Sequence, residues 1–88
     1  MSSDPYQVIK YPLSSEKSIR MMESDNKLIF VVRETATKIE IKEAVQNMFK
    51  VKVTNVNTQI TPRGEKRAIV KFAKETPAID IATNMGLI

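Results

Sequence analysis

The feature that most constrains the fold is one uninterrupted apolar run, Leu28-Ile29-Phe30-Val31-Val32, bounded by the polar residues Lys27 and Arg33. A continuous run of this length that is rich in β-branched residues is typical of a central strand. It is also the longest apolar run in the chain, and it is far shorter than the ~20 residues that a membrane-spanning helix needs. The sequence therefore predicts a small sheet built around residues 27–33.

The firmest helix signal follows this strand. Thr37 and Glu40 match a capping box, in which the hydroxyl and the carboxylate satisfy free amides at a helix start. The apolar residues that recur at helical spacing behind it are Ile41, Ala44, Val45 and Met48, with Phe49 beside them. We therefore expect an amphipathic helix directly after the central strand.

Two shorter helices and a first strand are also predicted. A strand over Tyr6–Tyr11 is closed by Pro12, and a helix over Glu16–Ser24 has Ser14 or Ser15 as its N-cap. The last helix is predicted to have Thr76 as its cap, Pro77 at its first position and Gly86 at its end. The residues expected on the buried faces of these two helices are Ile19 and Met22 in the first, and Ile79, Ala82 and Met85 in the last.

A hairpin is predicted over residues 51–73, with Thr61–Glu65 as its turn. Val51 and Val53 alternate inward, whereas Val56, Thr58 and Ile60 continue on the opposite parity. One extra residue near Thr54–Asn55, a β-bulge, reconciles the two phases. The outward residues are then Lys50, Lys52, Asn55, Asn57 and Gln59; on the returning strand Ala68, Val70 and Phe72 face inward, and Arg67, Ile69 and Lys71 face outward.

The predicted order is strand-helix-strand-helix-strand-strand-helix within one domain of 88 residues. This order indicates the α+β class, with a small mixed, mostly antiparallel sheet and helices packed on one face. The strand–helix–strand segment from Leu28 to Val53 is expected to form a right-handed parallel crossover. The other face, or the edge of the hairpin, would be left for a partner.

The residues that usually carry chemistry are scarce. Cysteine, histidine and tryptophan are absent, which removes the usual ligands of zinc, copper and iron, and the acids are scattered. Ser14-Ser15-Glu16-Lys17 is explained better as a helix cap followed by exposed charge than as a Ser–Lys pair. The segment Met1–Pro5 lacks the layout of a signal peptide. We therefore expect a soluble cytoplasmic protein that is not an enzyme and needs no metal or cofactor.

The charge is distributed unevenly. Residues 1–49 hold seven bases and seven acids, whereas residues 50–74 hold seven bases and one acid, Glu65. Such a segment suits a polyanion, although a basic face can also serve solubility alone. Asparagine is disfavoured in strands, and Arg63-Gly64 puts a cation on a turn, so we interpret the hairpin as an RNA-binding surface. The candidate RNA-binding residues are Lys50, Lys52, Asn55, Asn57, Arg63, Lys66, Arg67 and Lys71.

Three stretches resemble a known family. They are Pro12–Lys17, then Ala36–Val45 with Phe49–Val53 and Val56–Thr58, and finally Lys66–Phe72, whose paired bases precede an apolar strand. In this order they resemble the universal large-subunit ribosomal protein twenty-three family, in its short archaeal-type form. They span most of residues 9–81. One departure is the tight turn Pro62–Glu65, where bacterial members carry a basic loop that reaches the tunnel wall, so this chain is not expected to enter the tunnel.

The resemblance implies a structural protein that binds large-subunit ribosomal RNA beside the exit of the polypeptide tunnel, among neighbouring ribosomal proteins. It also implies a docking surface for visiting factors, namely signal recognition particle and the protein-conducting channel, without membrane insertion. Glu16 matches the acid that bacterial members use for docking, and Arg20 lies one turn further along the same predicted helix. The rival hypothesis is a non-ribosomal adaptor whose basic hairpin binds an acidic protein.

Overall fold

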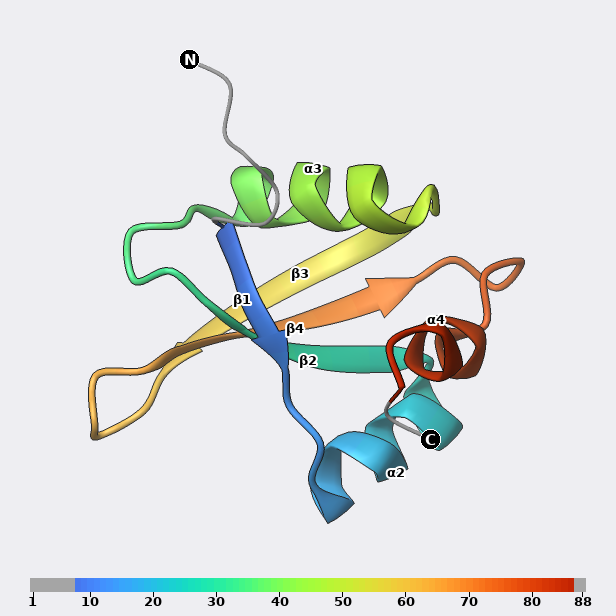
Figure 1. Ribbon diagram of the computed structural model, residues 1–88, viewed down its shortest axis with the longest axis horizontal. Coiled ribbons are helices and arrows are strands. Elements are labelled where there is room, and N and C mark those ends of the chain that lie inside the picture. The colour runs from blue at the N-terminus through green and yellow to red at the C-terminus, as the bar shows by residue number, and fades with distance from the viewer. Residues whose placement is uncertain (1–7, 87–88) are drawn as a thin grey trace.

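The computed structural model describes residues 8–86, so the predicted strand position of Tyr6 lies outside the described residues. Seven elements follow one another in the predicted order (Figure 1). They are β1 (Ile9–Pro12), α2 (Glu16–Asp25), β2 (Lys27–Val32), α3 (Lys38–Phe49), β3 (Val53–Ile60), β4 (Lys66–Phe72) and α4 (Ala78–Asn84). The α+β class is confirmed.

The four strands form one sheet in the order β1-β2-β4-β3, with β2 and β4 inside. Each neighbouring pair is antiparallel. Strands β2 and β3 run in the same direction, as the crossover prediction requires, but they do not pair, because β4 returns through the hairpin turn and lies between them. The sheet is therefore wholly antiparallel among the described residues, where a mixed but mostly antiparallel sheet was expected.

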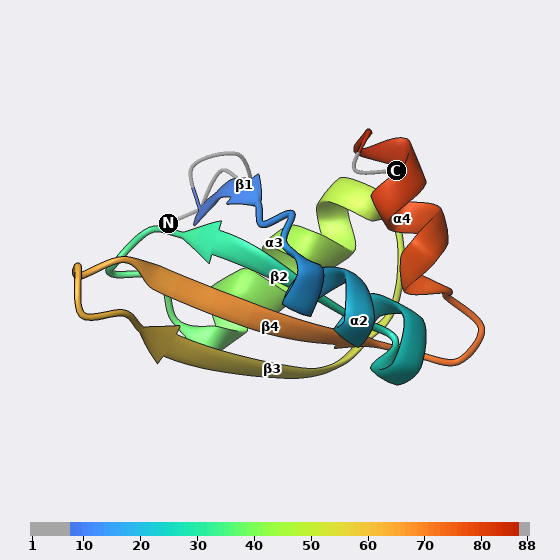
Figure 2. The same ribbon diagram turned by 90° about the horizontal axis from the view of Figure 1, so that it is seen from below.

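The helices are distributed around the sheet. Helix α3 lies over one face of the sheet, and α4 lies beside the end of the sheet at which β2 begins and β4 ends (Figures 1 and 2). Both views place α2 on the side away from α3, near the start of β2. The expectation that all helices pack on one face therefore differs from the structure at α2. Only Ser18 and Met22 of α2 are buried, so this helix covers the end of the sheet rather than a whole face.

The core lies mainly between α3 and the sheet. Its largest fully buried side chains include Phe30, Phe72 and Ile41. The rings of Phe30 and Phe49 stack with centroids 6.2 Å apart, which joins β2 to the end of α3. Ile41, Ala44 and Val45 are buried on α3, as the helical spacing predicted. Burial of such side chains contributes about 1.5–3 kcal/mol each relative to exposure.

Two helix starts confirm the local sequence signals. Ser15 caps α2, and its box is completed by Ser18, which lies three residues on. Thr37 caps α3: its hydroxyl accepts from the Glu40 amide at 3.2 Å, and Glu40 Oε1 accepts from the Thr37 amide at 3.0 Å. In each box two backbone amides that lack a helical partner are satisfied by side chains.

The start of α4 differs from the prediction. Its N-cap residue is Pro77, and no side chain of the cap residue itself makes the capping bond, so Thr76 is not the cap. Asn26, which follows α2 in the left-handed conformation, takes this role: its Oδ1 accepts from the Ala78 amide at 2.6 Å. Of the predicted buried face, Ala82 is buried and Met85 is partly buried, but Ile79 is 47% exposed, and Ala78 and Ile81 are buried in its place.

Candidate nucleic-acid interface

The hairpin carries one polar face, which is set by strand register. A register shift between Val53 and Asn55 confirms the predicted bulge, and Thr54 Oγ1 donates to the Lys71 carbonyl at 3.2 Å within it. After this shift every second residue of β3 faces away from α3. The group that results, called here the outer face, consists of Asn55, Asn57 and Gln59 on β3 and Arg67, Ile69 and Lys71 on β4.

Three rows of paired residues cross this side of the sheet. The first row is Tyr11, Val31, Arg67 and Gln59; the second is Ile29, Ile69 and Asn57; the third is Lys27, Lys71 and Asn55. Ile29 and Val31 are buried, whereas the β3 amides are exposed. A cation therefore stands in the first and third rows, an apolar residue stands between them, and an amide ends each row at the β3 edge.

The third row places two like charges together. Lys27 is paired with Lys71 in the β2–β4 register. Like charges directly opposite each other destabilise a sheet, so this pairing favours an anion nearby. Lys27 was not among the candidate residues, because only the strand order brings it beside the hairpin.

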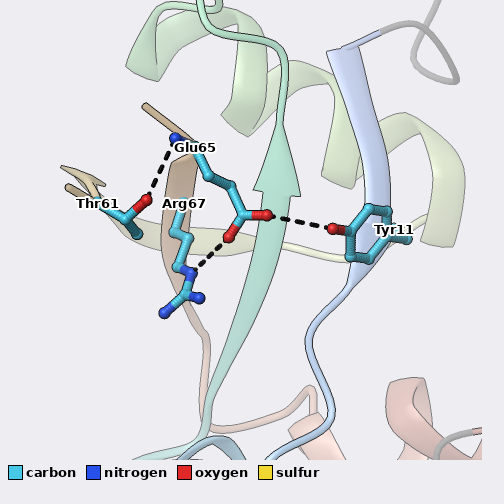
Figure 3. Close-up of polar contacts among 4 residues, drawn as sticks. All are labelled: Tyr11, Thr61, Glu65 and Arg67. Carbon is cyan, nitrogen blue, oxygen red and sulfur yellow. Dashed lines mark hydrogen bonds and ion pairs between the residues drawn. The ribbon is translucent and has the colours of Figure 1, made fainter. Parts of the chain in front are cut away.

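Two residues of the first row, Tyr11 and Arg67, form a hydrogen-bonded cluster with Glu65, which precedes β4 (Figure 3). Arg67 Nε donates to Glu65 Oε1 at 2.9 Å, and the Tyr11 hydroxyl donates to Glu65 Oε2 at 3.2 Å. The hydrogen bond from Arg67 is the main cause that lowers the pKa of Glu65 below its usual 4.5. The charge of Glu65 in turn raises the pKa of Tyr11 above 10.0. The cluster thus joins β1 to β4 across Val31.

The turn itself holds Arg63 outward. The Gly64 amide donates to the Thr61 carbonyl at 2.9 Å, and the Thr61 amide donates to the Glu65 carbonyl at 2.8 Å. Gly64 adopts a φ of +84°, a conformation that glycine reaches without strain. Arg63 is exposed on this turn and lines an open hollow of about 290 Å³ together with Lys10 and Tyr11. The predicted turn is therefore confirmed.

The structure brings some of the candidate residues together and separates others. Asn55, Asn57, Arg67 and Lys71 share the outer face, and Arg63 lies at its turn end. Lys66 points to the α3 side instead, where its Nζ donates to the Ala36 carbonyl at 2.6 Å. Lys66 alternates in phase with Ala68 and Val70 along β4, and this spacing already predicts that its side chain lies on the side of the sheet that faces α3.

Lys50 and Lys52 lie at the opposite end of β3 from the turn. Lys50 ends α3 with a φ of 55°, and Lys52 is exposed in the connection to β3. Sequence reasoning also left Gln59, Tyr11 and Glu65 out of the candidate set. Gln59 has the same parity as Asn57 and could have been included, whereas Tyr11 and Glu65 are brought together only by the strand order.

A second charged surface lies on α2. Arg20 Nη2 and Glu16 Oε1 form an ion pair at 3.0 Å, one helical turn apart. Both side chains are more than three-quarters exposed, so the pair contributes little to stability. Ser15 and Lys17 line a shallow hollow with them. These are the two residues that the resemblance suggested for docking.

Two further classes of site can be assessed within residues 8–86. Across that range no helix is both long enough and apolar enough to cross a membrane. The same residues contain no group of three or more carboxylates that could hold a metal ion.

Comparison with known proteins identifies the family. The model of the family described as "Ribosomal protein L23" matches residues 7–82. The "Large ribosomal subunit protein uL23" of Methanothermobacter thermautotrophicus is 48% identical over 84 residues, which cover 96% of this chain and 98% of the relative. The proteins of the same name from Methanococcus aeolicus and Methanococcus vannielii are each 43% identical over the same shares. The expectation that the chain is not an enzyme agrees with these relatives, which are ribosomal proteins. The match of the family model and the identity to the relatives confirm the predicted resemblance, so the chain belongs to the ribosomal protein L23 family.

Proposed function

We propose that this protein is a structural component of the large ribosomal subunit and binds large-subunit ribosomal RNA through the outer face of β3 and β4. The observation that carries this proposal is the register, which aligns Asn55, Asn57 and Gln59 with Lys71, Ile69 and Arg67 on one face. RNA-binding surfaces use basic side chains to contact phosphates, and they use side-chain amides to contact sugars or the edges of nucleobases. The names of the matched relatives support the large subunit as the location.

The arrangement favours recognition of backbone and shape. Arg67 and Lys71 are four residues apart on β4, which corresponds to about 13 Å along a strand. At that separation each cation would contact a different phosphate. On this side of the sheet the aromatic side chain is Tyr11 of β1, which is half-exposed and hydrogen-bonded to Glu65, and the outer face of β3 and β4 adds none on which a base could stack. Ribose hydroxyls and the shallow groove of an A-form helix therefore suit this face better than splayed single-stranded bases.

The tunnel exit and the visiting factors form the second part of the proposal. Helix α2 stands on the same side of the sheet as the outer face, but it packs beside β2, on the half of the sheet away from β3. The Glu16 and Arg20 side chains are more than three-quarters exposed, and an RNA that lies along the β3 edge would leave them accessible. Such a division suits a protein that is anchored by its hairpin and presents α2 to incoming factors. The proposed partners are signal recognition particle, the protein-conducting channel and neighbouring ribosomal proteins.

Binding to a large-subunit RNA fragment from the tunnel-exit domain, compared with transfer RNA across a salt series, tests the RNA interface. If about five phosphates are neutralised, log affinity falls against log salt with a slope of roughly −3.5 to −4.5. A clear preference for the ribosomal fragment would support the proposal. Equal and weak binding of both RNAs would contradict it and would favour an adaptor that meets acidic proteins.

A further inference from the structure

Glu65 is the one acid in the basic segment 50–74, and both oxygens of its carboxylate are engaged. Oε1 accepts from Arg67 Nε, and Oε2 accepts from the Tyr11 hydroxyl. The Glu65 backbone amide donates to Thr61 Oγ1 at 3.2 Å. The carboxylate is therefore held from β1 and from β4, while the backbone of Glu65 is held from the turn.

An acid in this place is unfavourable for RNA binding on charge alone. It lies beside the cations of the proposed interface, where its charge repels a phosphate. Solubility does not require it, because the chain has nine other acids outside this segment. The contacts of Glu65, rather than its charge, must therefore explain what it contributes.

We propose that Glu65 is a positioning residue that orients Arg67 for an RNA phosphate. This inference rests on the proposed function and deepens it. Arg67 uses Nε for Glu65, and its two terminal nitrogens point away from Glu65 and Tyr11 (Figure 3). Two terminal N–H groups in one plane form the fork that binds a phosphate bidentately. A guanidinium held by its Nε presents this fork in a fixed direction.

Tyr11 completes the arrangement by fixing Glu65. It is paired with Val31, which is paired with Arg67, so the three residues lie in one row across the sheet. The Tyr11 hydroxyl reaches over this row to Glu65, a residue 54 positions away in the sequence. The orientation of Arg67 thus depends on the docking of β1. The lowered pKa of Glu65 keeps its carboxylate ionised further into the acidic range than an ordinary glutamate.

Charge and positioning predict the same result for Glu65→Gln and opposite results for Glu65→Ala. Glu65→Gln removes the charge but keeps an oxygen that accepts from Arg67 Nε, and its amide can donate to the Tyr11 hydroxyl. Glu65→Ala removes the charge and both contacts. Glu43→Ala is the matched control, because it removes an exposed acid of α3, which lies over the opposite face of the sheet from the outer face. Binding of each variant to the ribosomal fragment and to transfer RNA would be measured at fixed salt.

We expect Glu65→Gln to bind the ribosomal fragment at least as tightly as the wild type, and Glu65→Ala to bind it about three- to tenfold less tightly. Transfer RNA should bind both variants slightly more tightly, as it does Glu43→Ala. Tyr11→Phe should weaken binding of the fragment in the same direction as Glu65→Ala, with a smaller effect. If Glu65→Ala and Glu65→Gln both gain affinity for both RNAs by the factor seen with Glu43→Ala, Glu65 acts only as a charge and the inference is overturned.

A second measurement uses the wild type and does not depend on RNA preference. In nitrogen-15 NMR spectra the Arg67 Nε–H signal should keep its position when either RNA is added, while the signals of the two terminal nitrogens shift. Movement of the Nε–H signal to a phosphate-bound position would mean that RNA displaces Glu65, which would refute the positioning role. Equal binding of both RNAs by the wild type, with the Nε–H signal unmoved, would remove the proposed function but not the positioning of Arg67.

Discussion

Lys27 lies directly opposite Lys71 across the β2–β4 pair, so two ammonium groups share one side of the sheet. Neither residue is fully buried, and Lys71 is also paired with Asn55 on β3. Cross-strand pairs of like charge destabilise a sheet by a few tenths of a kcal/mol to about 1 kcal/mol. The free protein therefore carries a small electrostatic strain that a bound phosphate would relieve.

Replacement of Lys71 by glutamine tests this relationship. Without RNA, Lys71→Gln should raise the free energy of unfolding by about 0.2–1 kcal/mol, because the repulsion of Lys27 is removed. With the ribosomal fragment, affinity should fall and the salt slope should become shallower by about 0.7–0.9, which corresponds to one phosphate. Urea unfolding and a salt series of binding measurements check both effects. An unchanged salt slope in Lys71→Gln would contradict the proposed interface.

Thr37 and Thr76 were the predicted N-caps of α3 and α4, and replacing each with alanine should change the free energy of unfolding by different amounts. Thr37 closes a complete capping box with Glu40, so Thr37→Ala should lower the free energy of unfolding by about 1 kcal/mol. Thr76 makes no capping bond through its side chain, and its backbone contacts survive the substitution. Thr76→Ala should therefore change stability by less than about 0.5 kcal/mol. Equal losses in the two variants would show that Thr76 contributes a cap after all.

Asn26 should be the most sensitive polar residue outside the hairpin. Its Nδ2 lies within 3.1–3.2 Å of the carbonyls of Phe72, Ala73 and Thr76, and its Oδ1 accepts from Ala78. Its backbone is left-handed, with a φ of 56°. Asn26→Ala loses these bonds and is strained, so we expect a loss of roughly 2–4 kcal/mol.

Asn26→Gly separates the two causes, because glycine adopts the left-handed conformation without strain but makes none of the side-chain bonds. It should be destabilised less than Asn26→Ala, and hydrogen exchange at the Ala78 amide should accelerate in both variants. If Asn26→Gly matched the wild type in urea unfolding, the side-chain bonds to α4 would contribute nothing.

Local signals in the sequence predicted local structure. The capping box of Thr37 and Glu40, the inner strand after Lys27 and the bulge at Asn55 each depend on neighbours within a few residues, and each is confirmed. Parity along β3 and β4 likewise predicted the outer face, because side chains alternate strictly in a strand. Lys66 was included among the candidate RNA-binding residues although its parity places it with Ala68 and Val70, on the side of the sheet that faces α3.

The remaining features depend on contacts between distant residues. The cap of α4 comes from Asn26, 52 positions before Ala78, and Lys66 donates to Ala36, 30 positions earlier. Tyr11 meets Glu65 only because β1 and β4 both pair with β2. Strand order is decided by packing of the whole domain, and no motif within one segment encodes it. The side of the sheet that α2 covers depends on the same packing.

Ile41 and Ile60 have the same hydrophobic side chain but differ in burial, so they should contribute differently to stability. Ile41 is fully buried on α3, whereas Ile60, expected to face inward, is 71% exposed at the end of β3. Ile60 has the inward parity but lies at the turn end of an edge strand, beyond the core residues of β3. Ile41→Ala should lower the free energy of unfolding by about 2–5 kcal/mol, and Ile60→Ala by less than about 0.5 kcal/mol. A loss above 1.5 kcal/mol at Ile60, measured in urea, would mean that β3 is covered in solution.

The Tyr11–Glu65–Arg67 cluster should weaken at both ends of the pH scale. The pKa of Glu65 is lowered from 4.5 in the folded protein, chiefly by the hydrogen bond from Arg67, so its contribution to stability is present above that value and is lost as the pH falls through the lowered pKa. The pKa of Tyr11 is raised above 10.0, chiefly by the charge of Glu65, so its contribution is present below pH 10 and is lost as the pH rises through the raised pKa.

NMR titration of the Glu65 carboxyl carbon and of the Tyr11 ring should give midpoints displaced in these directions. In Tyr11→Phe the Glu65 midpoint should move part of the way back toward 4.5, because one of its two hydrogen-bond donors is removed. A Glu65 midpoint at or above 4.5 in the wild type would mean that Arg67 does not hold the carboxylate in solution, and the orientation proposed for the RNA-binding guanidinium would lose its support.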